Sequence, residues 1–371
     1  MERNTVERLP ILYGLSKKGK VKEWSISVYD SSYPTIIVMH GYQDGKKQVD
    51  KKEIKVGKNI GRSNETSPWE QALSQAKSTW NKKKDNNYYE VLPKKEDMVK
   101  LPMLALEYSK RGHAIVFPCY AQPKFNGIRC TAVMDSGGII KFFSRKGKEF
   151  TVLNHLSSHL IGVMEPGDIL DGELYNHDLT FQQITAAVKR EKSTNPLTES
   201  IEYHVYDICD EDRDFDQRNE ALYARIQDHE DNPIKRVSTK WILNEEQLIE
   251  YHEWLTSEGY EGTMVRNLKG GYMFQHRSEN LQKIKDFMDE EFDIIGGQGG
   301  QGRAENQCTF KCVTHDGKEF DVRCVGTDSD REEQLRNLPD YIGEELTVKF
   351  QNYSDDGIPI FPVGIEIRSY E

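Results

Sequence analysis

Alternation of apolar and polar residues predicts the first structural unit of the chain. Over residues 24–39 the apolar side chains fall on every second position, as they do in strands, and a turn follows at Gly45. A helical pattern then covers residues 69–84, and the polar, charged segment behind it contains Pro93, which indicates a linker. We therefore expect a small α+β module over residues 1–95.

The middle of the chain mixes strand and helix patterns. Helices are expected at residues 181–189, 217–229 and 245–255. The strand-like segments are residues 113–118, 127–134, 139–144, 168–175, 201–208 and 262–267. Because several of these strands are joined by short turns, the order favours an α+β domain with antiparallel sheets over a regular βαβ array. We assign this domain to residues 96–288.

The pattern changes again after Met288. Short strand-like segments alternate with Gly-rich or Asp-Gly turns, and one short helix is expected at residues 331–336. The segments are residues 292–297, 308–313, 319–325, 345–351 and 361–368. Short strands at this spacing suit a small closed barrel, and an OB-fold is the expected one. The all-β domain is predicted over residues 289–371.

Composition excludes several classes of protein. Of 371 residues 36% are hydrophobic and five are Trp, which excludes a disordered chain. No apolar run approaches the roughly 20 residues needed to span a bilayer. The first ten residues carry no export signal. We therefore expect a cytoplasmic protein, located in the host cytoplasm if the chain is viral. The six cysteines form no C-x-x-C pair and are expected to be free, buried thiols.

The net charge of −11 hides an uneven distribution. Residues 1–95 carry 19 Lys and Arg against 11 Asp and Glu, whereas the remaining residues carry 31 against 50. A polyanion is expected to contact the basic first module, while the acidic remainder needs local basic tracks or divalent cations to approach phosphates. Two alternatives are that the lysines form a solvated helix face, or that the module docks partner proteins.

The octet QPKFNGIR, residues 122–129, carries the first chemical signal. It places Lys124, a turn-forming Asn-Gly pair and Arg129 within reach of one phosphate. A lysine holds its proton up to a pH near about 10.4, so a nucleophilic lysine needs cations or burial around it. Taken alone, such a string is more often a surface turn between strands.

Two later segments supply acidic and aromatic groups. In ILDGEL, Asp171 and Glu173 lie two apart on a strand and share one face, where they can hold a ribose hydroxyl and a divalent metal. In YHVYDI, Tyr206 offers a flat surface on which a purine can stack. The structural alternatives are a turn at the Asp-Gly pair and a core tyrosine.

Two further segments supply a carboxylate and cations. Glu261 begins the strand EGTMVR and can bind a metal or activate the amine. Lys283 and Lys285 are expected on one strand face, where they provide two cations for a phosphate and for lowering the pKa of the nucleophile. The alternative for these two lysines is a solvated edge strand.

In this order the motifs KFNGIR, SRKG, LDGEL, HVYDI, EGTMVR and KIK resemble those of the covalent lysyl-nucleotidyltransferases, which comprise ATP-dependent DNA ligases, RNA ligases and mRNA capping enzymes. The resemblance runs from about Leu101 to the end. DNA ligases fit best, because KIKD leads into EEFDIIG and then into the expected OB domain; the compact chain resembles phage or viral enzymes. The family resemblance implies a nucleotidyltransferase domain, which is ATP-grasp-like with antiparallel sheets, followed by the OB-fold.

The resemblance implies a role for each motif residue. Lys124 would attack the α-phosphate of ATP and carry AMP, with Lys283 and Lys285 as the other catalytic residues. Nucleotide contacts are implied for Gln122, Lys124, Arg129, Glu173, Tyr206, Glu261, Lys283 and Lys285. The metal, Mg²⁺ or Mn²⁺, is implied at Glu261, Glu173 and Asp171. DNA contacts are implied for Asn126 and for Arg145, which would meet the 5′-phosphate.

The first module resembles, more weakly, the WGR-type domains found in some poly(ADP-ribose) polymerases, on the segments WSISV and GKNIGR and the lysine-rich helix end. This resemblance implies that Arg62 and Trp24 or Trp69 face DNA. With its basic charge, the module is expected to grip duplex beside the nick, with Lys82 and Lys83 among the contacts.

The expected function is an ATP-dependent DNA ligase that seals 3′-OH/5′-phosphate nicks in duplex DNA as a monomer. The alternative among enzymes is an RNA ligase or a capping guanylyltransferase, and the alternative outside catalysis is a catalytically weak nick-binding protein.

Two departures from the family pattern matter. Asn126 stands where most DNA ligases have Asp, so we expect a slower sealing step, or one that depends more on Glu261 and Glu173. The second departure is at the C-terminus, where cellular enzymes have a basic R-x-D-K motif that orients pyrophosphate; here the sequence ends in IRSYE. Arg368 is either a remnant of this motif or a strand residue, and in the second case we expect less assistance to the first step.

Overall fold

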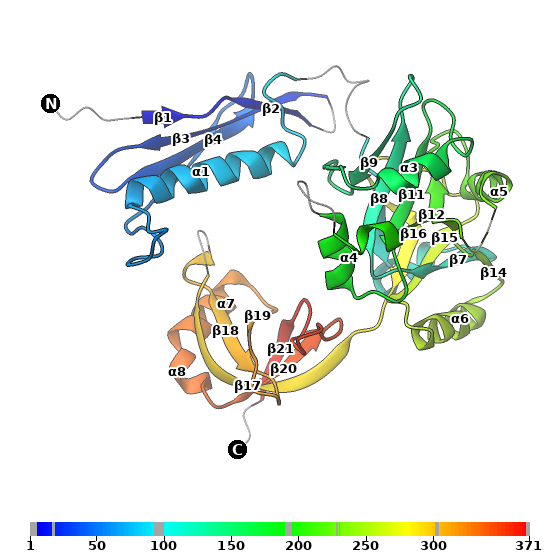
Figure 1. Ribbon diagram of the computed structural model, residues 1–371. Helices are drawn as coiled ribbons and strands as arrows, with labels where there is room; N and C mark the ends of the chain where they lie inside the picture. Colours follow the sequence, from blue (N-terminus) through cyan, green and yellow to red (C-terminus); the bar gives the residue numbers. More distant parts are fainter. Residues whose placement is uncertain are drawn as a thin grey trace.

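Three bodies follow one another along the chain in the computed structural model: an N-terminal module, a central domain with two sheets, and a closed barrel (Figure 1). The structure describes residues 6–16, 19–92, 100–189, 195–227, 229, 231–300 and 304–368. In this described part no helix has the length and apolar character that crossing a membrane requires. All six cysteines are free and five of them are buried, as expected.

A five-stranded antiparallel sheet and one helix make up the N-terminal module. Its strands are β1 (Val6–Arg8), β2 (Leu12–Leu15), β3 (Val21–Tyr29), β4 (Thr35–Tyr42) and β5 (Gln48–Glu53), in the order β1-β3-β4-β5 with β2 paired to β3. Helix α1 (Pro68–Lys84) starts from a capping box in which Ser67 and Glu70 satisfy each other's backbone N–H groups. Its buried Ala72 and Ala76 belong to one core with the residues of the sheet, including Trp24.

Two sheets form the central domain. The first has the order β10-β9-β8-β11-β12-β13 and the second has the order β14-β7-β15-β16-β6. The first-sheet strands are β8 (Ile128–Met134), β9 (Ile140–Ser144), β10 (Glu149–Phe150), β11 (Ile169–Tyr175), β12 (Glu202–Ile208) and β13 (Ile234–Arg236). The second-sheet strands are β6 (Leu104–Glu107), β7 (Cys119–Lys124), β14 (Lys240–Ile242), β15 (Gly262–Asn267) and β16 (Arg277–Ile284). Pairing is antiparallel as predicted, except that β13 lies parallel to β12 and β6 parallel to β16.

The chain passes from the second sheet to the first within the KFNGIR segment. Strand β7 ends at Lys124 and β8 begins at Ile128, so only residues 125–127 connect the two sheets. This connection runs close to β11, because a Cβ atom at Gly127 would lie 2.6 Å from the Leu174 carbonyl oxygen. Only glycine fits there, and the segment therefore places residues of one short motif in two different sheets.

Helices cover the sheets of the central domain. Helices α3 (Asn154–Leu160) and α4 (Phe181–Val188) lie in front of β8 and β11 in Figure 1 and share a core with them. The remaining helical elements are α2 (Tyr108–Arg111), η2 (Gly112–Ala114), η3 (Thr198–Ser200), α5 (Phe215–Arg225) and α6 (Glu245–Ser257). The predicted helix at residues 217–229 thus starts earlier, because Asp214 caps it through Gln217, and it ends at Arg225.

The third body is the closed five-stranded barrel that the sequence predicts, in the order β17-β18-β19-β21-β20. Its strands are β17 (Met288–Gly299), β18 (Cys308–Val313), β19 (Glu319–Cys324), β20 (Glu345–Phe350) and β21 (Val363–Arg368). Helices α7 (Asp328–Arg336) and α8 (Leu338–Tyr341) lie between β19 and β20. The core includes Phe292, Phe310 and Phe350, which are almost completely buried.

One predicted strand of the central domain is wrong. Residues 113–118 are apolar enough for a strand, but residues 112–114 form a 3-10 helix and β7 starts only at Cys119. Pro118 has no N–H for a sheet ladder, and the N–H of the exposed Val116 is bonded to the Asn267 side chain. No sequence pattern predicts strands β1, β2, β5, β6, β10, β13 and β14 or helix α3.

Candidate active site

Lys124 and Glu261 meet at the end of the second sheet. Lys124 is the last residue of β7, and Glu261 immediately precedes the neighbouring β15. The Glu261 N–H donates to the Lys124 carbonyl oxygen at 2.9 Å, and the Lys124 Nζ forms an ion pair with Glu261 Oε2. Gly262 has a φ of +147°, and a Cβ atom there would lie 2.3 Å from the Ile284 carbonyl oxygen. Glycine at this position therefore lets β16 approach the pair closely.

Two more lysines lie beside this pair, as the motif order implied. Lys285 Nζ is 3.5 Å from Glu261 Oε1, and the two side chains are 17% and 12% exposed. Burial lowers the pKa of Lys283, and the ammonium groups of Lys285 and Lys124 lower it further. The cations that a phosphate needs are thus gathered around one carboxylate.

Gln351, which sequence analysis missed, reaches this site from the barrel. It follows β20, its Nε2 donates to Glu261 Oε1 at 2.8 Å, and its Oε1 accepts from Lys285 Nζ at 2.6 Å. A glutamine at the end of an alternating strand has no pattern that distinguishes it. Only the folded arrangement of the two domains shows its position.

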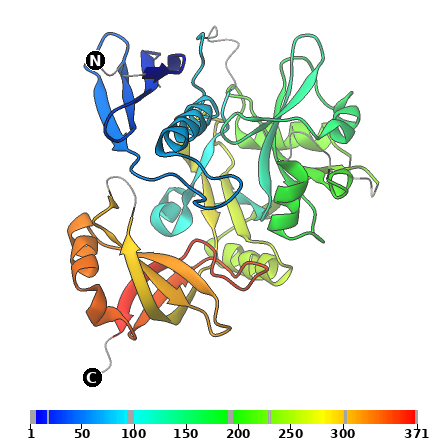
Figure 2. The ribbon, with the colours of Figure 1, turned by 60° about the vertical axis from the view of Figure 1, so that its left-hand side comes forward.

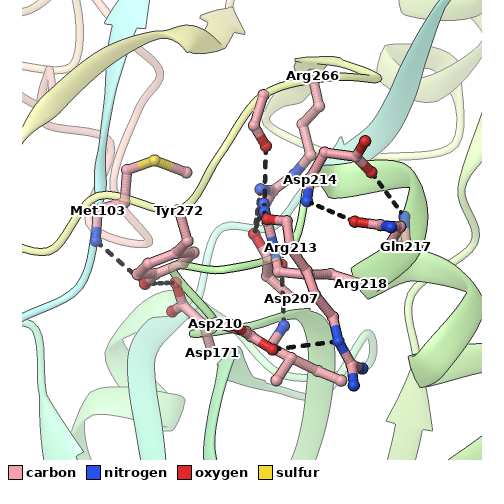
Figure 3. A network of polar contacts seen from close by, with 12 residues as sticks. Met103, Asp171, Asp207, Asp210, Arg213, Asp214, Gln217, Arg218, Arg266 and Tyr272 are labelled. Carbon is pink, nitrogen blue, oxygen red and sulfur yellow. Dashed lines mark hydrogen bonds and ion pairs between the residues drawn. The ribbon is translucent and has the colours of Figure 1, made fainter.

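Arg129 is held by a buried carboxylate. Its Nε and Nη2 atoms donate to Asp171 Oδ1 and Oδ2 at 2.9 and 2.5 Å. The Tyr272 hydroxyl donates to the same Oδ2 at 2.8 Å (Figure 3). Asp171 is 1% exposed, so both of its oxygens are engaged inside the protein. These contacts assign Asp171 to holding Arg129, in place of the metal-binding role expected from sequence.

Glu173 differs from Asp171 although both lie on β11. Its carboxylate makes no hydrogen bond or ion pair to another described residue, while its side chain lines the cavities on both sides of Arg129. Burial raises the pKa of Glu173 to about 8, against the lowering effect of Lys124 and Arg129. A half-buried, unpaired carboxylate close to a cluster of cations suits a metal ion or a ribose hydroxyl.

A cavity of about 220 Å³ opens above Lys124. Tyr206 is part of its wall, and the guanidinium groups of Arg266 and Arg129 lie over the Tyr206 ring at 5.6 and 5.9 Å from the ring centre. The other polar lining residues are Gln122, Lys124, Arg129, Arg145, Glu173, Arg266, Arg277 and Lys283. The cavity therefore joins one aromatic surface to a cluster of cations.

Gln122 supports the wall of this cavity with its side chain. Its Nε2 donates to Thr239 Oγ1 at 2.9 Å and to the Tyr206 carbonyl oxygen at 3.2 Å, and its Oε1 accepts from Arg266 Nε at 2.7 Å. Gln122 is 1% exposed. The amide atoms are all engaged, so the nucleotide contact expected for Gln122 is limited to its backbone and carbon atoms.

Behind Tyr206 lies a network of charges centred on Asp207 (Figure 3). Arg218 donates to both oxygens of Asp207, from Nε at 2.7 Å and from Nη2 at 3.2 Å, and Arg266 Nη1 donates to Oδ2 at 2.6 Å. All three side chains are almost completely buried. Because Arg266 also touches Gln122 and Tyr206, this network fixes the position of the aromatic surface.

Comparison with known families agrees with this geometry. Residues 102–285 match the model described as ATP dependent DNA ligase domain, and residues 299–368 match the DNA ligase OB-like domain. The chain belongs to the ATP-dependent DNA ligases.

Individual relatives extend the match beyond these two domains. The DNA ligase of African swine fever virus, isolate Pretoriuskop, is 26% identical over 402 residues, which cover 96% of this ligase and 94% of the viral protein. DNA ligase 1 of Korarchaeum cryptofilum is 26% identical over 218 residues, covering 54% of this chain and 39% of its own. The N-terminal module thus has a counterpart in the viral enzyme.

Solved structures show the same fold. A Lig E DNA ligase superposes with a TM-score of 0.60 at 22% identity and covers 73% of this ligase and all of its own chain. The structure Pmar-Lig_Pre has a TM-score of 0.66 at 17% identity, and the superposition covers 81% of this ligase and 72% of the Pmar-Lig chain. The fold class predicted from sequence is therefore confirmed for the central domain and the barrel, whereas the WGR resemblance of the first module stays a prediction.

A cleft of about 800 Å³ lies between the N-terminal module and the central domain of the ligase. Lys82, at the end of α1, lines it opposite Arg145 and Lys146, and Figure 2 shows α1 between its own sheet and the central domain. Burial lowers the pKa of Arg145, and the nearby cations Arg129 and Arg277 add to this effect. The cleft is continuous with the smaller cavity through Arg129, Arg145 and Glu173, which line both.

The remaining candidates for DNA contact divide into two groups. Asn126 is exposed on the connection between the sheets, and Arg62 is exposed in the loop before α1. The ammonium of Lys83 instead lies 4.0 Å from the centre of the Tyr88 ring, and Trp24 is 5% exposed in the core of the module. Lys83 and Trp24 therefore stabilise the module itself, contrary to the expectation that they face DNA.

Proposed function

We propose that this ligase seals 3′-OH/5′-phosphate nicks in duplex DNA through AMP bound covalently to Lys124. The observation that carries the proposal is the position of Lys124: its Nζ is paired with Glu261 at the floor of a cavity that also contains Lys283 and Tyr206. A surface lysine in a turn would have neither the carboxylate nor the surrounding cations.

The first step transfers AMP to the protein. The Lys124 amine attacks the α-phosphorus of ATP, a P–N bond forms, and the P–O bond to pyrophosphate breaks. Glu261 Oε2 is the acceptor placed for the proton that the amine loses. Lys283 and Lys285 neutralise charge on the phosphates, and Tyr206 provides a stacking surface for adenine.

Two further displacements seal the strand. An oxygen of the DNA 5′-phosphate attacks the lysyl-AMP phosphorus, which releases Lys124 and leaves AMP on the DNA end. The 3′-hydroxyl then attacks the 5′-phosphate, the phosphodiester forms, and AMP leaves. Arg145 faces the cleft where the 5′-phosphate would enter, and the exposed Asn126 is available to orient the 3′-hydroxyl.

The site fits a divalent cation. Mg²⁺ is typically bound by one or two carboxylates together with substrate phosphates. Glu173 offers an unpaired, half-buried carboxylate, and Glu261 has lone pairs beyond those used by its present partners. When bound, the metal would neutralise phosphate charge and help to hold reacting oxygens in line.

The cleft between the N-terminal module and the central domain is the proposed path of the duplex. Lys82 and Arg145 approach it from opposite sides, and Lys146 and Lys148 line it as well. We propose that the ligase is a monomer which holds DNA between residues 1–95 and the nucleotidyltransferase domain, residues 96–288, with residues 289–371 as the OB domain. For a viral protein, the host cytoplasm is the proposed location.

Labelled nucleotides test the proposal. Incubation with α-labelled ATP should label the wild-type protein but not Lys124→Ala, and the wild type should then seal a nicked DNA duplex. Label from GTP alone would indicate a capping enzyme, and sealing restricted to RNA strands would indicate an RNA ligase. Equal sealing by the wild type and Lys124→Ala would show that Lys124 takes no part in catalysis.

A further inference from the structure

A neutral amide from the barrel lies between opposite charges at the adenylation site. We propose that Gln351 is a positioning residue for the attack of Lys124 on ATP: it holds Lys285 away from Glu261 and so reserves that carboxylate for the nucleophile. The inference rests on the proposed function, because it assigns Gln351 to the first step of that reaction.

Distances show how the competition between the two lysines is resolved. Lys285 Nζ is 2.6 Å from Gln351 Oε1 but 3.5 Å from Glu261 Oε1, so its short contact is with the amide. The same amide donates from Nε2 to Glu261 Oε1 at 2.8 Å. Glu261 Oε2 is left facing Lys124. One amide therefore satisfies a cation and orients a carboxylate without adding charge of its own.

The barrel fixes where this amide lies. Gln351 follows Phe350, whose side chain is fully buried in the barrel, and the Gln351 N–H donates to the Ile360 carbonyl oxygen at 3.1 Å. A second contact joins the same loop to the central domain, since Thr180 Oγ1 donates to Asp355 Oδ2 at 2.8 Å. Gln351 can reach Glu261 only while the barrel lies against the central domain, and the exposed Thr180–Asp355 contact is one of several contacts of the barrel with that domain.

Loss of the amide has a definite structural consequence. Lys285 Nζ, now 3.5 Å from Glu261 Oε1, would then be free to move into direct hydrogen-bond contact with it, and two ammonium groups would compete at short range for one carboxylate. Lys124 would lose the single orientation that its pairing with Glu261 imposes. Even a small displacement of the attacking nitrogen from its reactive position lowers the reaction rate. Docking of the barrel and alignment of the nucleophile thus become one event.

Single-turnover adenylation of Lys124 in the full chain tests the proposal. Gln351→Met keeps the length of the side chain and removes both hydrogen bonds; Gln351→Glu keeps an acceptor for Lys285 but faces Glu261 with a second carboxylate. Both should lower the maximal rate by about 10- to 100-fold, as loss of a supporting partner typically does. The ATP concentration at half-maximal rate should change little, and thermal unfolding should show that both variants fold.

Asp355→Ala is the matched control, because it removes the exposed Thr180–Asp355 contact of the same loop but leaves Gln351 in place. It should adenylate nearly as fast as the wild type. Unchanged maximal rates in both Gln351 variants would overturn the proposal, and so would an equally slow Asp355→Ala. Absence of label on the wild type would instead contradict the proposed function, so the two failures are distinguishable.

Discussion

Arg129 and Asp171 form a two-bond ion pair between neighbouring strands of the first sheet, and the hydroxyl of Tyr272 donates to the same carboxylate. The pair turns a flexible arginine into a fixed element of the cavity above Lys124. It also explains why two acidic residues of one motif serve different purposes, since Asp171 holds Arg129 while Glu173 is left open.

Asp171→Asn should weaken both stability and nucleotide binding. The substitution keeps the shape of the side chain but leaves the Arg129 guanidinium buried without its counter-charge, which typically costs about 3–5 kcal/mol of unfolding free energy. Chemical denaturation would measure the loss, and the ATP concentration for half-maximal adenylation should rise. Asp210→Asn is the control, because its pair with Arg213 is partly exposed and such pairs contribute about 0–1 kcal/mol. Similar losses in the two variants would contradict this account.

Glu173→Gln should stabilise the protein increasingly as the pH rises. Burial raises the pKa of Glu173 to about 8 from an ordinary value of 4.5, so in this interval the folded state holds a proton that the unfolded chain has released. The unfolding free energy of the wild type therefore falls as pH rises through the interval. Thermal unfolding from about pH 5 to pH 8 should show the difference between variant and wild type growing. Glu173→Asp retains a carboxyl group and should keep the fall in stability with rising pH. Parallel curves of stability against pH for the wild type and Glu173→Gln would disprove the role of Glu173 in this pH dependence.

Lys82 and Lys83 should have different roles although they are adjacent. Lys82→Ala should weaken nicked-DNA binding and reduce the slope of log affinity against log salt by about 0.9 if Lys82 meets one phosphate. Lys83→Ala should leave that slope nearly unchanged and destabilise the module, because Lys83 packs on Tyr88. Titrations of nicked DNA at several salt concentrations would separate the two roles.

Deleting residues 1–95 should leave Lys124 adenylation nearly intact but weaken DNA binding. An unchanged affinity for nicked DNA would refute the role of the N-terminal module in holding the duplex.

Asn126→Asp should accelerate sealing without changing adenylation. The exposed amide can orient the 3′-hydroxyl but supplies no negative charge. A carboxylate there should speed the sealing of a pre-adenylated nick by roughly tenfold, less than a full general base provides, because orientation is already present. Asn126→Ala should be slower than the wild type in the same assay. If all three proteins seal at one rate, Asn126 takes no part in the step.

Local sequence patterns predicted the parts of this ligase that depend on neighbours along the chain. Strands β11 and β12, the barrel and the position of Lys124 beside Glu261 follow from alternation and from motif order. The failures involve partners that are distant in sequence. The sequence implies a metal-binding role for Asp171, because its contact with Tyr272, 101 residues away, is invisible in a strand pattern. Gln351 was missed for the same reason, since it meets Glu261 from another domain.

Strand β16 ends at Ile284 and β17 begins at Met288, so residues 285–287 alone connect the central domain to the barrel. The first of these residues is Lys285, whose ammonium contacts Gln351. Any rotation of the barrel must be taken up by backbone dihedral angles at or next to Lys285, the residue proposed to neutralise charge on the phosphates. The hinge and the active site therefore share an amino acid, and a glycine insertion after Lys285 would loosen domain orientation and cation placement at once.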